Sequence, residues 1–270
     1  MIDTVPDILA RIVAKKREEL ARGAARSGEL ERRAEERTAE RRDFRAALIA
    51  GRPAGRPLGP PAIIAEIKKA SPSAGVLAAE FDPARIASAY QLGGAAALSV
   101  LTDGPFFQGS LADLEAARAA ARLPVLRKDF TLDRRHIVEA AANGADAILL
   151  IAAILSEREI RDLREDAARY RMAALVEAHN RRELDAAIAA GSDIIGVNNR
   201  DLATFGVTLE TSLRLAEHIP ESAVRVSESG IRDAGDIARL RQAGYTAFLV
   251  GGHLMQSADP AAALRELVAA

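Results

Sequence analysis

Several residue types that this sequence lacks already exclude some classes of function. It contains no cysteine, which excludes disulfides, thiolate metal sites and a cysteine nucleophile. It contains no tryptophan and only 4% aromatic residues, which disfavours a stacking surface for single-stranded nucleic acid. The formal net charge is -1, so no large basic field is available for nonspecific nucleic-acid binding. We therefore expect no nucleic-acid partner.

Long hydrophobic runs are absent as well. No apolar run approaches the length needed to span a bilayer, and the first residues, MIDTVPD, do not form a basic and then apolar signal. We expect a soluble cytoplasmic protein without membrane contact. The chain has 270 residues, of which 49% are hydrophobic, so it can bury a sizeable core. This length is normal for a single α/β barrel.

Residues 1–60 are predicted to form a helical extension followed by a linker. The apolar residues of 4–22 share one helical face, and Thr4 followed by Asp7 fits an N-terminal cap. Residues 29–45 carry dense charge of both signs, which favours a solvated helix over a partner-binding segment. Residues 51–61 are too rich in Gly and Pro for regular structure. We expect the extension to pack near the mouth of the main domain.

Residues 61–270 show a strand and helix rhythm. Eight short apolar runs begin near residues 62, 95, 123, 146, 172, 193, 223 and 246. Amphipathic segments separate them, at 83–92, 111–121, 135–143, 157–170, 181–190, 210–218 and 233–243. Such alternation indicates βαβ units and a parallel sheet, and eight units predict a (β/α)8 TIM barrel. A doubly wound open sheet is the alternative, although no dinucleotide or Walker A motif supports it.

The first predicted strand ends in a carboxylate and an ammonium. Glu66 and Lys68 occupy alternate positions after the apolar run 62–65, so both side chains point to the same face. Ser71-Pro72 then stops the strand, because proline donates no backbone hydrogen bond. For one strand alone, a solvated ion pair would be the simpler interpretation.

Polar groups end most of the other strands too. Six of the eight ends carry charged, amide or glycine residues, among them Glu66 and Lys68, Lys128, Glu177, Asn198, Glu228, and Gly251 with Gly252. In a barrel the C-terminal strand ends meet at one rim, where ligand chemistry takes place. A purely structural barrel needs no such convergence. The pattern therefore predicts an enzyme.

The last two strand ends suggest an anion site. Ser229-Gly230 and Gly251-Gly252 offer small side chains and free backbone N–H groups on neighbouring loops. Barrels often bind phosphate between the loops after strands 7 and 8. The alternative is that these glycines only permit tight turns. We expect a phosphate group at this position.

The two rim lysines suit acid and base chemistry. Lys128 lies between Arg127 and Asp129, so the sequence leaves the direction of its pKa shift open. A Schiff-base lysine is a rival role for such a residue. The four histidines do not have metal-ligand spacing, and we expect no metal. His179 follows Glu177 by two residues and is interpreted as a loop residue.

With these residues in view, the chain resembles the indole-3-glycerol phosphate synthase family. The motifs IIAEIKKASPS, LSVLTD, LPVLRKDF, LVEAH, GVNNRDL, SESGI and AFLVG follow in the family's order and cover essentially the whole chain. The resemblance implies ring closure, decarboxylation and dehydration of 1-(2-carboxyphenylamino)-1-deoxyribulose 5-phosphate in tryptophan biosynthesis. It implies no cofactor. A sister isomerase, a Schiff-base aldolase and a non-catalytic phosphate-binding protein are the alternatives.

The resemblance also implies roles for individual residues. Lys128 matches the general acid for ring closure, Glu177 the base in dehydration, and Lys68 a second lysine that contacts the substrate carboxylate. Glu66 and Asn198 would orient these groups. The implied substrate-binding residues are Ser71, Phe107, Phe130, Arg200, Glu228, Ser229, Gly230, Gly251 and Gly252. Two departures from the family pattern, Ala74 and Gly252, bear on affinity. The expected partner is a small phosphosugar, and we expect a monomer.

Overall fold

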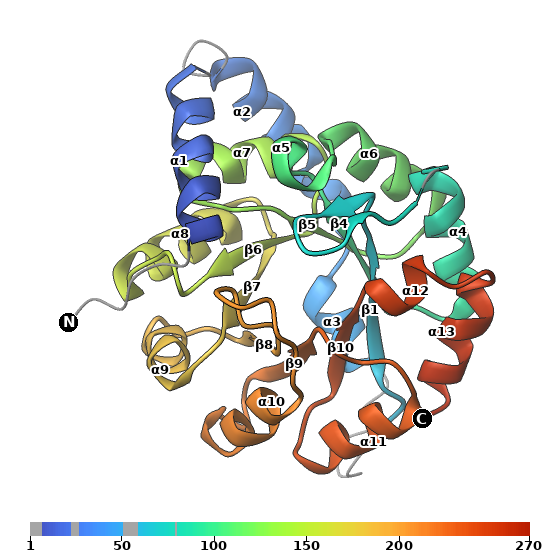
Figure 1. The fold of residues 1–270 in the computed structure, drawn as a ribbon. Coiled ribbons are helices and arrows are strands. Elements are labelled where there is room, and N and C mark those ends of the chain that lie inside the picture. Colours follow the sequence, from blue (N-terminus) through green and yellow to red (C-terminus); the bar gives the residue numbers. More distant parts are fainter. Residues whose placement is uncertain (1–6, 23–26, 51–58, 79) are drawn as a thin grey trace.

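The computed structural model describes residues 7–22, 27–50, 59–78 and 80–270. Eight parallel strands form a closed barrel, in the order β1-β10-β9-β8-β7-β6-β5-β4 around the ring (Figure 1). This confirms the predicted TIM barrel and excludes the open sheet. Each strand begins within two residues of its predicted start: β1 Ala62–Ile67, β4 Ala97–Leu101, β5 Val125–Lys128, β6 Ala147–Ile151, β7 Ala173–Ala178, β8 Ile194–Asn198, β9 Val224–Glu228 and β10 Ala247–Val250.

An outer ring of helices covers the strands (Figure 1). The predicted helical segments correspond to α4 Pro83–Gly93, α6 Leu111–Ala120, α7 Arg134–Ala142, α8 Glu157–Arg169, α9 Arg181–Ala189, α10 Glu210–Leu215 continued by η3 Ala216–His218, and α11 Ala234–Gln242. Short polar side chains cap most of these helices, as Asp82 caps α4 by accepting from the amides of Ala84 and Arg85. Gly94 ends α4 at a φ of 90°, a conformation that glycine adopts without strain.

One hairpin and three helices were not predicted from the sequence. They are the hairpin of β2 Ala70–Ser71 with β3 Gly75–Val76, the short helices α5 Gly104–Phe107 and α12 Gly252–Met255, and the C-terminal helix α13 Pro260–Val268. Three of them lie in loops after strands, at the end of the barrel that carries the polar residues. No helix in the described part of the chain is long and apolar enough to cross a membrane.

The strands alternate between two hydrophobic cores. On β1, Ile64 packs in the barrel interior with Leu126 and Leu249, whereas Ile63 belongs to the layer between strands and helices. This period of two explains why Glu66 and Lys68, which continue the interior register of Ile64, reach the rim together. The hydrophobic interior therefore ends in a layer of charge.

The N-terminal extension forms α1 Asp7–Arg22, α2 Ser27–Glu36, η2 Arg37–Glu40 and α3 Phe44–Ile49. Phe44 and Leu48 of α3 pack against Ala62 and Val224, where strands begin, so α3 closes the bottom of the barrel (Figure 1). At the other end, Ile12 of α1 lines the cavity at the mouth, as predicted for the extension. The predicted cap Thr4 and most of the predicted linker, residues 51–58, lie outside the described residues.

The prediction of a solvated helix for residues 29–45 was wrong at its C-terminal end. Arg41 Nη2 donates to the carbonyl of Ala141 at 2.6 Å, and Arg42 Nη1 donates to the carbonyls of Ala121 and Leu123, both at 2.7 Å. These guanidinium groups satisfy backbone carbonyls at helix and loop ends of the barrel. Charge density alone could not distinguish such contacts from solvation.

Candidate active site

One cavity of about 660 Å³ lies at the C-terminal end of the barrel. It contains all of the site residues predicted from the sequence. They come from the rim ends of β1, β5, β7, β8, β9 and β10 and from the loops that follow the strands: Glu66, Lys68, Ser71, Phe107, Lys128, Phe130, Glu177, Asn198, Arg200, Glu228, Ser229, Gly230, Gly251 and Gly252. The expected convergence of strand ends therefore occurs in space.

Lys128 lies at the centre of the charged layer. It is the last residue of β5, and its Nζ donates to Glu177 Oε2 and to Glu228 Oε2, both at 2.7 Å. Both carboxylates are buried, with exposed fractions of 3% for Glu177 and 1% for Glu228. One ammonium thus holds two carboxylates from two different strands.

The surroundings fix the charge states of these groups. Burial lowers the pKa of Lys128, but Glu177 and Glu228 outweigh it, so the pKa lies well above its ordinary value. Burial raises the pKa of Glu177, yet Lys128 and His179 bring it below its usual range. Burial also raises the pKa of Glu228, and the nearby charge of Glu177 raises it further. Lys128 lowers this pKa but does not offset both effects, so it lies at about 7. The resting site therefore holds Lys128 and Glu177 in their charged forms.

A second ion pair faces this cluster from β1. Lys68 Nζ donates to Glu66 Oε1, so the strand brings together the carboxylate and the ammonium that its sequence placed two residues apart. The hydroxyl of Tyr90, a buried residue of α4, donates to the backbone carbonyl of Glu66 at 3.1 Å. This bond anchors the strand end from behind, and the pair itself lines the cavity.

Two glycines make room for two carboxylates of the cavity wall, Glu66 and Glu228. A Cβ atom at Gly251 would overlap Glu66 Oε1 and lie 2.9 Å from its Cδ. A Cβ atom at Gly196 of β8 would overlap Glu228 Oε1 and lie 3.3 Å from its Cδ. The carboxylates thus lie flat against backbone that has no side chain. Sequence reasoning assigned Gly251 only to phosphate binding and did not single out Gly196.

The loops after β9 and β10 form the end of the cavity predicted to take phosphate. Ser229 and Gly230 both have positive φ, at 66° and 83°, which is uncommon for a serine. Asn199 Nδ2 holds this turn by donating to the carbonyl of Ser229 at 3.1 Å. The space beside Gly252 is open. It begins α12, and the N-cap residue, Gly251, supplies no side-chain acceptor for the first backbone N–H groups of this helix.

Two phenylalanines and the N-terminal helix form the opposite wall. The rings of Phe107 and Phe130 lie 6.1 Å apart between centroids, tilted by 38°. Ile8, Leu9 and Ile12 of α1 line the same cavity. Sequence reasoning placed the extension near the mouth but did not identify these residues. Their signal was the apolar face of the helix, which is equally typical of ordinary packing.

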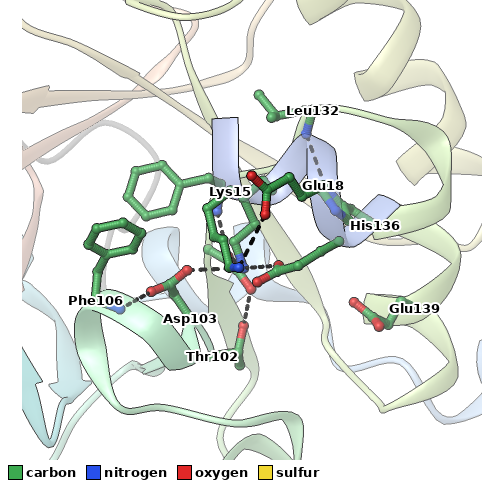
Figure 2. Close-up of polar contacts among 12 residues, drawn as sticks. Lys15, Glu18, Thr102, Asp103, Phe106, Leu132, His136 and Glu139 are labelled. Atoms are coloured by element: carbon green, nitrogen blue, oxygen red, sulfur yellow. Dashed lines mark hydrogen bonds and ion pairs between the residues drawn. The ribbon is translucent and has the colours of Figure 1, made fainter. Parts of the chain in front are cut away.

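A buried lysine of this helix forms ion pairs with the two loops that carry Phe107 and Phe130. Lys16 is 5% exposed, and its Nζ lies 2.8 Å from Asp129 Oδ1 and 3.1 Å from Asp103 Oδ2. Asp103 also caps α5 by accepting from the amide of Phe106 at 2.8 Å. Figure 2 shows Asp103 and Thr102 beside α1. Glu139 of α7 lies on the other side of this cluster of polar side chains. The amphipathic pattern places Lys16 on the face opposite the apolar residues, and nothing in the sequence indicated that this lysine is buried.

Three predicted site residues make contacts mainly within their own loops. Ser71 Oγ accepts from the amide of Ala74 at 3.2 Å. Asn198 Oδ1 accepts from the amide of Arg200 at 3.0 Å, and Arg200 Nη1 donates to the carbonyl of Phe205 at 3.2 Å. These bonds shape the two loops. All three side chains still border the cavity.

His179 lies in the loop that follows β7, as predicted, but its imidazole also reaches the carboxylate of Glu177. Its Nε2 lies 3.3 Å from Glu177 Oε1, on the side of the carboxylate away from Lys128. Its side chain is 11% exposed. The spacing of two from Glu177 was the available signal, because residues two apart on a strand share a face.

This fold and this site define a β/α barrel enzyme with a rim of lysines and carboxylates. A sequence model of the family "Indole-3-glycerol phosphate synthase" matches residues 9–267. The chain is 56% identical over 207 residues to the indole-3-glycerol phosphate synthase of Koribacter versatilis, covering 77% of this chain and 80% of that one. It is 49% identical over 263 residues to that of Leptothrix cholodnii, covering 97% and 99%. The chain belongs to the indole-3-glycerol phosphate synthase family, whose members are carboxy-lyases of tryptophan biosynthesis.

Solved structures with low sequence identity share the fold. A 3-hexulose-6-phosphate synthase aligns with a TM-score of 0.61 at 18% identity, over 77% of this chain and 98% of that one. A thiamine phosphate pyrophosphorylase from Pyrococcus furiosus aligns with a TM-score of 0.57 at 18% identity, over 76% and 93%. At such identity the likeness concerns the barrel alone.

Proposed function

We propose that this chain converts 1-(2-carboxyphenylamino)-1-deoxyribulose 5-phosphate to indole-3-glycerol phosphate. The observation that carries the proposal is the position of Lys128, in contact with two buried carboxylates inside a cavity that takes a substrate of this size. The reaction needs an acid at the carbonyl oxygen, an acid for the departing hydroxyl and a base that restores the aromatic ring. The residues that line the cavity include two lysines, Lys68 and Lys128, and the carboxyl groups of Glu66, Glu177 and Glu228 for these tasks.

Ring closure is assigned to Lys128. The ring carbon that bears the carboxylate attacks the ribulose C2 carbonyl, and the carbonyl oxygen takes a proton as the new carbon–carbon bond forms. The raised pKa of Lys128 keeps that proton available in the resting site. Loss of CO2 from the same ring carbon follows. Lys68, already paired with Glu66, would hold the substrate carboxylate before it leaves.

Dehydration is assigned to Glu177. The C2 hydroxyl leaves as water after it accepts a proton from a rim lysine, and the base takes a proton from the neighbouring ribulose C1 carbon, so that the new C1–C2 double bond completes the aromatic indole. A carboxylate that remains ionised in the resting site can accept this proton without first losing one. Glu228 lines the cavity and would contact substrate polar groups from the rim.

The remaining residues would hold the substrate in a bent shape. Backbone N–H groups of Ser229, Gly230 and Gly252 would bind the phosphate, while Phe107 and Phe130 would contact the anthranilate ring. These two groups lie on opposite walls of one cavity. Fixing both ends of the substrate brings the two reacting carbons together. With ideal alignment this can lower the activation barrier by about 7 to 11 kcal/mol.

The Schiff-base alternative finds little support at Lys128. A Schiff-base lysine must lose its proton to become a nucleophile. Two carboxylates at 2.7 Å favour the ammonium form instead. The cavity is lined by residues of one chain, which supports the proposal of a monomer. A cytoplasmic location also stays a proposal.

The test is to incubate the purified protein with this substrate, without added metal or nucleotide, and to follow the indole chromophore. Product formation is expected. A parallel sample treated with borohydride should retain activity, because no reducible imine forms on the pathway. Substrate binding without product would contradict the proposed reaction, and covalent trapping by borohydride would indicate an aldolase-type lysine instead.

A further inference from the structure

His179 contacts the proposed base from the side away from the cavity. It follows β7 by one residue, and its Nε2 lies 3.3 Å from Glu177 Oε1, while Lys128 Nζ holds Oε2 at 2.7 Å. The two oxygens of one carboxylate therefore face two different nitrogen cations. Lys128 borders the cavity, but His179 does not. The imidazole can act on substrate only through Glu177.

Glu183 fixes the orientation of the imidazole. Its Oε2 accepts from His179 Nδ1 at 2.9 Å and from the His179 amide at 2.8 Å. Its Oε1 accepts from Asn180 Nδ2 at 2.7 Å, at the start of α9. Glu183 is itself buried, with 7% exposed. The ring is thus held between two carboxylates, one in the helix and one in the strand.

This arrangement favours a charged imidazole. Burial lowers the pKa of His179, but Glu177 and Glu183 raise it to about 10 overall. Asp201, on the loop after β8, adds a further negative charge that interacts with His179. On the other side of Glu177, Lys128 and Glu228 complete the set of charged groups. Among the described residues, His179 Nε2 approaches Glu177 Oε1 as an ion pair at 3.3 Å without an aligned hydrogen bond.

A second cation becomes important when Lys128 gives up its proton. Glu177 and Glu228 then lose the ammonium that they share. Two carboxylates that share a site cannot both stay ionised easily, so one of them takes up a proton. A cation that remains beside Glu177 favours the ionised form of that carboxylate, so the other carboxylate takes up the proton.

We propose that His179, oriented by Glu183, is a positioning residue. It keeps Glu177 ionised and aligned as the base while Lys128 is deprotonated. Glu228, beside which the described residues place no cation other than Lys128, becomes the carboxyl group that takes up the proton. This inference rests on the proposed function, because it concerns the same ring-closing and dehydration steps.

The kinetic test compares His179→Asn with Glu177→Gln and with a matched control, His218→Asn. His218 lies on η3, contacts Glu217 at 3.5 Å and does not line the cavity. In His179→Asn we expect kcat to fall about 10- to 100-fold with a smaller change in KM. The acid limb of the kcat profile should move to higher pH by about one unit or more, because Glu177 loses a nearby positive charge. The control should match the wild type.

A double mutant and a charge-only variant keep the test independent of folding defects. His179→Asn combined with Glu177→Gln should cost little more than Glu177→Gln alone, since the histidine acts through that carboxylate. Glu183→Gln keeps most of the local hydrogen bonds but removes one charge, so it should shift the acid limb in the same direction by less. Additive losses, or a His179→Asn profile that superimposes on the wild type, would overturn the proposal.

Nitrogen NMR of the ligand-free protein supplies a readout that does not depend on turnover. Both ring nitrogens of His179 should carry a proton at neutral pH, and Glu183→Gln should lower its pKa. A neutral imidazole at neutral pH would contradict the proposal directly. If the wild type made no product while His179 was charged, the proposed function would fail. If product formed and His179→Asn behaved as the wild type, only this inference would fail.

Discussion

The carboxylate of Glu66 lies in the space that a side chain at Gly251 would occupy. The two residues belong to neighbouring strand ends, β1 and β10, and a Cβ atom at Gly251 would overlap Oε1 of Glu66. The φ of Gly251 is -123°, which any residue can adopt, so the backbone itself does not require glycine. The glycine is required by the carboxylate, which in turn holds Lys68.

Gly251→Ala should therefore disturb the Glu66–Lys68 pair. We expect kcat/KM to fall about 10- to 100-fold, because a small displacement of a positioning group is costly in a fixed site. Gly252→Ala is the contrasting variant, since nothing lies within 4 Å of a Cβ atom there. Its loss should be clearly smaller. Steady-state kinetics of both variants test the argument, and equal losses would contradict it.

Lys16→Met should weaken both the fold and the substrate site. The change leaves Asp103 and Asp129 buried without their shared ammonium. Breaking a buried pair in this way costs about 3 to 5 kcal/mol. Lys15→Met removes an exposed pair with Glu18 and should cost less than about 1 kcal/mol. Urea unfolding measures both values.

The same variant should raise KM more than it lowers kcat. Asp103 caps the helix that carries Phe107, and Asp129 Oδ1 accepts from the amide of Phe130 at 2.8 Å. Without Lys16, the loops that carry Phe107 and Phe130 lose the ion pairs that connect both of them to α1. A Lys16→Met enzyme with the KM of the wild type would show that α1 does not position the phenylalanines.

The pKa of Glu228 predicts a pH-dependent stability difference. Its folded-state pKa is raised from 4.5 to about 7, so between these values the folded protein binds a proton that the unfolded chain releases. The wild type therefore loses stability as pH rises through this window. The Glu228→Gln variant should lose less stability over this pH range. At about pH 8 it should be more stable than the wild type, although its turnover should be lower.

Denaturant unfolding at a series of pH values measures this difference. Glu221→Gln, an exposed carboxylate at the other end of the barrel, serves as the matched control. A wild type and a Glu228→Gln variant with parallel pH profiles would show that Glu228 titrates normally in the folded protein.

Much of the fold could be predicted from the sequence, because the strand ends are marked by both pattern and chemistry. The period of two on β1 predicted that Glu66 and Lys68 would share the rim, and they form an ion pair there. The apolar runs gave all eight barrel strands within two residues. The placement of the predicted site residues in one cavity followed from the barrel topology.

What the sequence could not reveal depends on contacts between distant segments. Lys16 reads as one charge among several on an amphipathic helix, and only the packed structure shows two aspartates around it. The direction of the Lys128 pKa shift depended on Glu177 and Glu228, which are 49 and 100 residues away. The role of His179 likewise depends on Glu183 reaching back from the next helix.

The most direct test of the whole account is the single-turnover rate of indole formation by Lys128→Met beside the wild type, with folding confirmed by circular dichroism. The account predicts that the wild type forms indole-3-glycerol phosphate and that the variant is slower by about 10²- to 10⁴-fold, because it lacks the general acid. A folded variant that forms the product at the wild-type rate would contradict the central place of Lys128 between Glu177 and Glu228.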